Sequence, residues 1–220
     1  MRLVFLGPPG AGKGTHAQVL SKDLGVLHIS TGDMLRDSVK AGTPLGLEAK
    51  KNMDDGKLVP DKVVIGLVAE RLERPDAHMG FILDGFPRTP EQAKALDEEL
   101  KMLQMPLDMA LDFETSLPMI IRRLSGRRLC PKCNKNYHVH NYPPKKEGMC
   151  DVCGSTLVQR PDDRVEAIEN RLKIYKEVTE PLIQYYKTSG RLVQLDGDID
   201  VAPLNIILMN LFREKGLCRK

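Results

Sequence analysis

The sequence has no apolar run that approaches the roughly 20 residues needed to cross a bilayer. It also has no strong charge of either sign: the net charge is +3, too small to indicate a nucleic-acid or membrane partner. Tandem repeats of 20–50 residues and low-complexity tracts are absent as well. Arg2 precedes only four apolar residues before a glycine-rich stretch, so we expect no signal peptide.

The remaining composition is that of a globular protein, with 41% hydrophobic and 29% charged residues. A chain of 220 residues can form one large domain with room for a small insertion. We expect a cytoplasmic, reducing setting. In such a setting the five cysteines are better explained as thiolate ligands than as disulfides.

The most informative segment is GPPGAGKGT, residues 7–15. It follows the apolar run Leu3–Leu6, which predicts a buried strand, and precedes apolar residues at helical spacing. Strand, glycine-rich turn and helix form the context of a phosphate-binding loop. Backbone N–H groups, the helix N-terminus and Lys13 would together bind the polyphosphate of a nucleotide.

The loop departs from the usual pattern at one position. A Ser or Thr that coordinates magnesium usually follows the lysine, but here Gly14 intervenes and the hydroxyl comes at Thr15. Direct coordination of magnesium by this hydroxyl therefore stays open. We interpret His16 as a residue on the surface of the helix.

Apolar runs predict four more strands, at residues 26–29, 80–84, 109–113 and 192–195. Helices are expected over residues 15–24, 34–39, 44–53, 61–72, 117–124, 165–187 and 201–215, with another that begins at Thr89-Pro90. Strands that alternate with helices predict an α/β fold with a parallel sheet covered on both faces. Asp84 ends one strand, where an acid often helps to hold magnesium beside a phosphate loop.

A segment of different composition interrupts this alternation at residues 126–162. Its cysteines follow the spacing C-x2-C-x16-C-x2-C, which is typical of a structural four-thiolate zinc site. The ligands would be Cys130, Cys133, Cys150 and Cys153. His138 and His140 could replace a ligand, although the cysteines already complete the coordination shell. Cys218 would be a free thiol.

The cysteine segment contains almost no aliphatic side chains, so metal binding would provide much of its stability. Zinc ribbons often bind nucleic acid, which is the competing interpretation. Against it, the basic residues here are not interleaved with stacking aromatic residues, and the segment interrupts a nucleotide-binding fold.

Five motifs in this order resemble the adenylate kinase family over essentially the whole chain: residues 7–15, 30–34, 84–89, 126–128 and 162–163. Gly14 after the lysine is also a trait of that family. The resemblance implies a P-loop nucleoside monophosphate kinase fold with a five-stranded parallel sheet. It further implies a core of residues 1–29, 74–125 and 163–220, an NMP-binding segment of residues 30–73 and a zinc-binding lid of residues 126–162.

The resemblance implies reversible, Mg2+-dependent phosphoryl transfer from ATP to AMP, which gives two ADP, in a monomer with a structural Zn2+. Implied catalytic residues are Lys13, Arg88, Arg123, Arg160 and Arg171. Implied ATP-binding residues are Gly10, Ala11, Gly12, Lys13, Gly14, Thr15, Arg123, Arg127 and Tyr137. Implied AMP-binding residues are Thr31, Arg36, Lys57, Leu58, Val59, Gly85, Arg88, Gln92, Arg160 and Arg171. Asp84 and Asp33 would position magnesium through water.

Residue chemistry agrees with this assignment, because planar guanidinium groups contact phosphate oxygens bidentately. Arg123 and Arg127 are four residues apart and would share one face if the helix continued into the lid. We expect Arg122 and Arg128 to face solvent.

Two alternatives remain at this stage. One is a kinase for another nucleoside monophosphate, although Thr31 and Gln92 favour adenine. The other is a P-loop switch or zinc-ribbon binding module that binds nucleotide or nucleic acid without transferase activity. Gly126 and the pair Asp162-Asp163 flank the lid and are candidate hinges.

Overall fold

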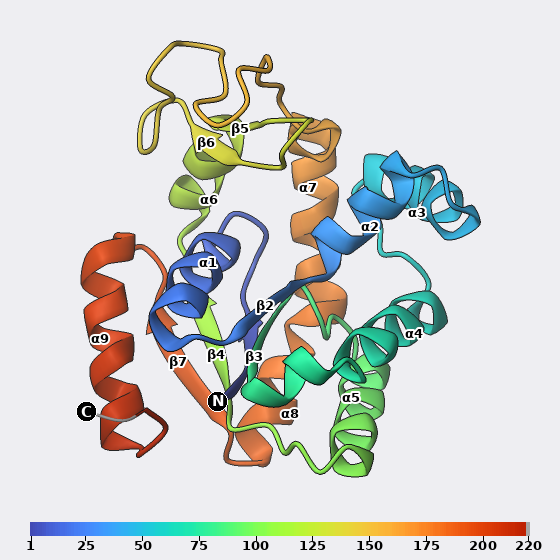
Figure 1. Ribbon diagram of the computed structural model, residues 1–220, viewed down its shortest axis with the longest axis vertical. Coiled ribbons are helices and arrows are strands. Elements are labelled where there is room, and N and C mark those ends of the chain that lie inside the picture. Colours follow the sequence, from blue (N-terminus) through green and yellow to red (C-terminus); the bar gives the residue numbers. More distant parts are fainter. Residues whose placement is uncertain (219–220) are drawn as a thin grey trace.

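The structure, a computed structural model, describes residues 1–218 (Figure 1). At its centre lies a five-stranded parallel sheet with the strand order β2-β3-β1-β4-β7. The strands are β1 (Arg2–Leu6), β2 (Leu27–Ser30), β3 (Phe81–Asp84), β4 (Met109–Glu114) and β7 (Leu192–Asp196). The predicted α/β fold with a five-stranded parallel sheet is confirmed.

Nine α-helices connect or cover these strands in the described residues. They are α1 (Lys13–Leu24), α2 (Thr31–Lys40), α3 (Pro44–Asp54), α4 (Asp61–Leu72), α5 (Pro90–Met102), α6 (Leu117–Ser125), α7 (Val165–Ile174), α8 (Pro181–Thr188) and α9 (Val201–Glu214). Short 3-10 turns occupy Pro75–Met79 and Pro161–Asp163. No helix among residues 1–218 combines the length and the apolar character required to cross a membrane.

The sheet is buried on both faces, as the continuous apolar runs predict. Alternate residues of β1 belong to different apolar clusters: Leu3 and Phe5 pack with α1 and α9, whereas Val4 and Leu6 pack with α4, α5 and α8. This period of two follows from the alternation of side chains along a strand. The carboxyl ends of the strands are therefore held rigidly at one edge, where the loops of the site begin.

The helix expected over residues 165–187 is interrupted. A π-helical turn, Tyr175–Thr179, separates α7 from α8, and the Glu180 N–H donates to the carbonyl of Tyr175 at 2.8 Å. Pro181 follows, and it has no N–H with which to continue the regular ladder. The prediction of one continuous helix was therefore wrong. The spacing of apolar residues does not reveal a local change from α-helical to π-helical hydrogen bonding.

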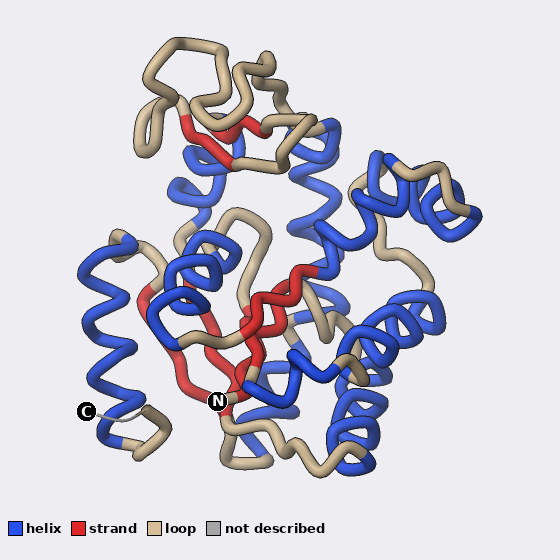
Figure 2. Tube along the Cα trace, viewed as in Figure 1, coloured by secondary structure: helices blue, strands red, loops and turns tan. Residues whose placement is uncertain are grey.

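Residues 126–162 project from α6 and α7 as a small, loop-rich unit, seen above both helices in Figure 2. Its regular structure is one antiparallel pair of strands, β5 (Arg127–Leu129) and β6 (Asn136–His138). Helices α2 and α3 lie below this unit and to its right in Figure 1.

Candidate functional site

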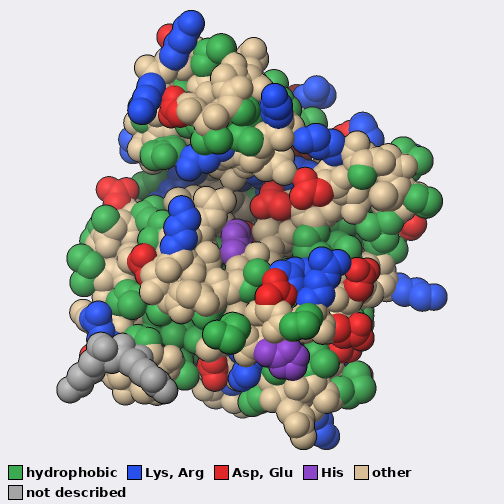
Figure 3. Space-filling model, in the orientation of Figure 1, with side chains coloured by type: hydrophobic (Ala, Val, Ile, Leu, Met, Phe, Trp, Pro, Cys, Tyr) green, Lys and Arg blue, Asp and Glu red, His purple; other side chains and the backbone are tan. Residues whose placement is uncertain are grey.

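A large cavity, of about 1100 Å³, opens between the sheet edge, helices α2 to α4 and residues 126–162. Figure 3 shows the hollow between the upper unit and the main body, with Lys, Arg, Asp and Glu side chains gathered around it. All the residues predicted to bind nucleotide or magnesium line this cavity, whereas the four cysteines do not. The sequence prediction therefore selected residues from distant segments that the fold brings together.

The glycine-rich loop forms the floor of the cavity. Gly10 has a φ of 87°, a left-handed conformation that suits glycine. A Cβ atom at Gly10 would lie 2.9 Å from Leu124 Cγ and 3.1 Å from the Ile120 carbonyl oxygen, both on α6. The loop thus packs directly on α6, and only glycine allows this approach.

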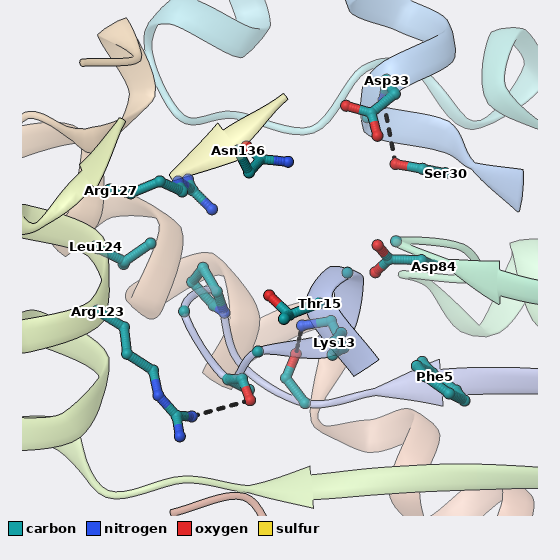
Figure 4. A pocket seen from close by; sticks show the side chains of 18 of the residues that line it. Phe5, Lys13, Thr15, Ser30, Asp33, Asp84, Arg123, Leu124, Arg127 and Asn136 are labelled. Atoms are coloured by element: carbon teal, nitrogen blue, oxygen red, sulfur yellow. Dashed lines mark hydrogen bonds between the residues drawn. The ribbon is translucent and has the colours of Figure 1, made fainter. Parts of the chain in front are cut away.

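Lys13 begins α1 and is tied to the loop that precedes it. Its Nζ donates to the carbonyl oxygens of Gly7, at 2.6 Å, and Pro8, at 2.8 Å (Figure 4). Burial lowers the pKa of Lys13 to about 8, although Asp84 acts in the opposite direction. An anion beside the ammonium would offset this desolvation, so the loop is suited to phosphate.

Asp84 lies at the end of β3 and faces the first turn of α1. A Cβ atom at Gly14 would approach Asp84 Oδ2 to 3.0 Å, which explains why glycine stands where other phosphate loops carry a hydroxyl residue. His28 Nε2 lies 3.5 Å from the same oxygen. Burial raises the pKa of Asp84, but His28 and Lys13 lower it by more, so the carboxylate is held ionised.

Asp33 lies in the first turn of α2, across the cavity from the loop. Its backbone N–H donates to Ser30 Oγ at 3.3 Å, which caps the helix, and its carboxylate accepts from Arg36 at 2.6 Å. Thr31 donates its hydroxyl hydrogen to the Gly85 carbonyl at 2.9 Å. Only acceptor positions therefore remain on this hydroxyl for a ligand.

Figure 4 shows Lys13 and Thr15 between two groups of charged side chains: Arg123 and Arg127 lie on one side, Asp33 and Asp84 on the other. Arg123 Nη1 donates to the carbonyl oxygens of Ala11, at 3.1 Å, and Gly197, at 2.7 Å. This guanidinium is therefore fixed at the edge of the phosphate loop.

Arg123 and Arg127 do not share a helix face, because α6 ends at Ser125 and Arg127 begins β5. The condition for a shared face, a helix that continues into residues 126–162, is therefore not met, whereas the predicted helix over residues 117–124 is present. Arg127 instead makes a bidentate pair with the buried carboxylate of Asp163. Of the two arginines expected to face solvent, Arg122 is exposed, whereas Arg128 is half-buried and donates to the Arg127 carbonyl at 2.8 Å.

Two more arginines complete a cationic wall. Arg160 is 8% exposed and donates to Asn136 Oδ1 at 2.6 Å, while Arg171 donates to the Asp162 carbonyl at 2.8 Å. Burial, together with the charges of Arg127 and Arg36, lowers the pKa of Arg160 to about 9. The cavity therefore holds more positive charge than its acids neutralise locally, and an anionic ligand would stabilise it.

The four paired cysteines come together as predicted, with their Sγ atoms all within 4.8 Å of one another. The Cys130–Cys153 and Cys133–Cys150 separations, 3.4 and 3.5 Å, are close to the ~3.8 Å expected between thiolates around tetrahedral zinc. These separations also exclude disulfide bonds in this structure. The donor set thus fits a structural Zn2+.

The two cysteine pairs sit in turns of the same design. Cys130 N–H donates to Lys135 O and Asn134 N–H to Cys130 O; Cys150 N–H donates to Ser155 O and Gly154 N–H to Cys150 O. Asn134 and Gly154 both adopt positive φ, 58° and 69°. Tyr137 packs against this cluster, with its hydroxyl 3.5 Å from Cys150 Sγ.

Residues of the cysteine unit contact α2 across the opening of the cavity. Lys40 Nζ donates to the carbonyl oxygens of Pro131 and Lys132, both at 3.2 Å. Asn134 Nδ2 donates to Asp37 Oδ1 at 2.8 Å. Residues 126–162 and α2 therefore contact each other at the margin of the cavity.

His16 is buried, and the expectation of a helix-surface position was wrong. Its side chain is 1% exposed, and its ring packs on Phe113 with 5.2 Å between centroids. Burial and the charge of Arg123 lower its pKa to about 4, so the imidazole is neutral near pH 7. The spacing of apolar residues in α1 predicts a single buried face. Because both α9 and β4 pack on this helix, a second face, which carries His16, is buried as well.

Asp112, near the end of β4, is a buried acid that the sequence analysis missed. It is 1% exposed, and no group among the described residues donates a hydrogen bond to its carboxylate. Burial and the charge of Glu114 raise its pKa to about 6. The sequence feature that drew attention to Asp84, an acid at the carboxyl end of a predicted parallel strand, is also present at Asp112 and could have identified it.

We expect Asp112→Asn to stabilise the protein at pH 8 and to have no such effect at pH 4. The folded-state pKa lies above the ordinary value, so the parent loses stability as pH rises from about 4 to about 6. A pKa shift of this size changes the free energy of unfolding by ~3 kcal/mol at most. Urea unfolding at both pH values measures the difference, with exposed Glu98→Gln as the control. Equal stabilities of parent and Asp112→Asn at pH 8 would contradict a desolvated, ionised Asp112.

Residues 5–191 match the family model described as "Adenylate kinase". The chain is 55% identical over 197 residues to the adenylate kinase of Thermodesulfovibrio yellowstonii, covering 90% of this chain and 92% of the relative. It is 52% identical over 206 residues to that of Acholeplasma laidlawii, covering 94% of both chains. The adenylate kinase of Archaeoglobus fulgidus is 51% identical over 201 residues, covering 91% of this chain and 93% of the relative.

Proposed function

The chain belongs to the adenylate kinase family of nucleoside monophosphate kinases, and we propose that its cavity binds ATP and AMP together and transfers a phosphoryl group between them with Mg2+. One observation carries the assignment of the site: the phosphate loop lines the same cavity as arginines from α2, α6, β5, α7 and the loops that precede α5 and α7. Phosphoryl transfer requires positioning and charge stabilisation more than covalent chemistry, which is what this arrangement offers.

ATP, in this proposal, lies along the phosphate loop. Gly10 to Thr15 bind its phosphates through backbone N–H groups, and Lys13 neutralises charge at the bridge to the transferred group. Arg123 and Arg127 flank the polyphosphate, and the ring of Tyr137 forms part of the wall. The hydrogen bonds from Arg123 to Ala11 and Gly197 support this role, because they hold the guanidinium beside the loop before any ligand binds.

AMP would bind on the opposite side, between α2, α4 and α5. Arg36 and Arg88 bind its phosphate, while Gln92 and Thr31 face the base, with Lys57, Leu58, Val59 and Gly85 completing the pocket. The free acceptor positions of Thr31 and the buried amide of Gln92 suit the hydrogen-bonding groups of adenine. Arg160 and Arg171 would bind the transferring phosphoryl group from above.

Asp84 and Asp33 are the residues suited to position Mg2+ through water. Both carboxylates have lowered pKa values despite burial, so both are ionised near pH 7. The metal, when bound, neutralises charge on the phosphate oxygens. Thr15, which follows Gly14, is exposed. Direct coordination of Mg2+ by its hydroxyl is therefore an open alternative.

Zn2+ would serve structure rather than chemistry. Four thiolates complete its coordination, leaving no position for substrate or water. The apolar cluster of this unit consists of Cys130, Tyr137, Cys150 and Leu157 with Cys153 against it, so the cysteines themselves make up most of its core. We propose that residues 126–162 form the lid, residues 30–73 the NMP-binding unit, and the remainder the core.

We expect Cys153→Ser to reduce bound zinc and the melting temperature while activity persists where the protein stays folded. Structural zinc binds isolated peptides with an apparent free energy of ~10–16 kcal/mol, much of it coupled to folding. Because the lid is attached at both ends to folded helices, loss of one ligand should remove only part of this stabilisation. A loss of only ~2 kcal/mol would lower the melting temperature by about 4–8 °C for a chain of this size.

Zinc content, thermal unfolding and ADP formation are measured on one preparation, with Cys218→Ser as the matched control because Cys218 lies outside the cluster. Loss of activity at unchanged zinc content and melting temperature would mean that the cysteines take part in catalysis.

The function is tested by a coupled assay of ATP with AMP, UMP, CMP and GMP. We expect ADP to form fastest with AMP. Preference for another acceptor would identify a kinase with a different base pocket, and nucleotide binding without ADP formation would support a non-enzymatic binding module.

A further inference from the structure

A short hydrogen-bond chain lies behind the proposed AMP pocket. Gln92 is 2% exposed and lines the cavity, whereas Asp61, at the start of α4, does not line it. Asp61 accepts from Gln92 Nε2 at 2.7 Å through Oδ1 and from Thr89 Oγ1 at 2.8 Å through Oδ2. Gln92 Oε1 in turn accepts from the backbone N–H of Arg88 at 2.7 Å.

These two neighbours determine which way the Gln92 amide faces. The Arg88 N–H can only donate, and both carboxylate oxygens of Asp61 act as acceptors. Turning the amide by 180° would set its NH2 group against an N–H and its oxygen against a carboxylate. Both contacts would then be repulsive, so one orientation is strongly preferred.

The orientation of an amide is what distinguishes 6-aminopurines from 6-oxopurines. Adenine presents a donor at its 6-amino group and an acceptor at N1. Hypoxanthine and guanine present an acceptor at O6 and a donor at N1. After their contacts with Asp61 and Arg88, the oxygen and nitrogen of Gln92 each retain one further hydrogen-bonding position. An amide held in one orientation can match the first pattern, and only the turned amide can match the second.

We propose that Asp61 is a positioning residue that determines base specificity: by fixing the Gln92 amide, it excludes 6-oxopurine monophosphates from the acceptor site. This inference rests on the proposed AMP site. Asp61 acts through Gln92 and does not itself contact the base. Without Asp61, the Arg88 N–H alone opposes the turned amide, so discrimination weakens without disappearing.

The experiment compares kcat/KM for AMP and IMP, with ATP as donor, in the parent, Asp61→Leu and Asp61→Asn. IMP is the sharpest probe because its base differs from adenine only at positions 6 and 1. Leucine has nearly the same shape as aspartate but cannot accept a hydrogen bond. Asparagine keeps an acceptor for Gln92, while its NH2 group can donate to the Thr89 hydroxyl.

We expect the AMP-to-IMP ratio to fall about tenfold in Asp61→Leu, which is what the loss of one charge-assisted hydrogen bond corresponds to. The ratio should stay within about threefold of the parent in Asp61→Asn, since that variant retains a hydrogen bond of ordinary strength to Gln92. A general loss of structure would instead lower both activities together and leave their ratio unchanged.

An unchanged ratio in folded Asp61→Leu would overturn the inference, as would an equal fall in Asp61→Asn. If Asp61→Leu does not fold, Asp61→Ala removes the same acceptor without adding volume and carries the same expectation. A parent that uses IMP as well as AMP would instead overturn the proposed role of Gln92 in reading the base, so the two failures are distinguishable.

Discussion

Lys13→Met is expected to lower kcat for ADP formation by about 10²–10³-fold or more, with the fold intact. Lys13 Nζ is held at the mouth of the phosphate loop by the carbonyl oxygens of Gly7 and Pro8. Charge shifts between phosphate oxygens at this point during transfer, so the ammonium stabilises the transition state more than the bound nucleotides. Methionine keeps the aliphatic stem and removes only the charge.

Steady-state kinetics with varied ATP and AMP, together with circular dichroism, measure this effect. Lys62→Met is the matched control, because Lys62 is exposed on α4 and does not line the cavity. A folded Lys13→Met protein with near-normal kcat would contradict the assignment of the phosphate loop.

Arg88→Ala is expected to lower kcat by about 10³-fold, the smallest effect typical of an arginine that stabilises transferring phosphate. The Arg88 guanidinium donates from Nε to the Gly85 carbonyl at 2.8 Å, which holds it at the end of β3. Its backbone N–H, which contacts Gln92, remains in the alanine variant. The preference for AMP over IMP should therefore persist while the rate falls.

The control is Arg74→Ala, since Arg74 is exposed and pairs with Glu70. Both variants are assayed with AMP and IMP at saturating ATP. A normal kcat accompanied by altered base preference would show that the Arg88 side chain serves recognition of the base rather than transfer.

The parts of the fold that the sequence predicted are those with a strong local pattern. Each strand of the central sheet is a short, mainly apolar segment, and every predicted boundary agrees with the structure to within one residue. The cysteine cluster was predictable because its spacing alone defines a ligand set.

What the sequence did not predict depends on distant neighbours. His16 is buried because a second layer, α9 and β4, covers α1. The π-helical turn at Tyr175–Thr179 requires an adjustment that periodicity does not encode. The role of Asp61 depends on Gln92 and Thr89, about thirty residues away, so no local motif reports it.

The central claim is that one cavity holds both nucleotides with their phosphates end to end. Hydrogen exchange of the whole chain, with and without a bisubstrate mimic of two adenosines joined through phosphates, tests it most directly. We expect one mimic to bind per chain and to protect residues 7–15, 31–59 and 126–162 together, because lid closure excludes water. Protection confined to the phosphate loop, or two mimics bound per chain, would contradict the claim.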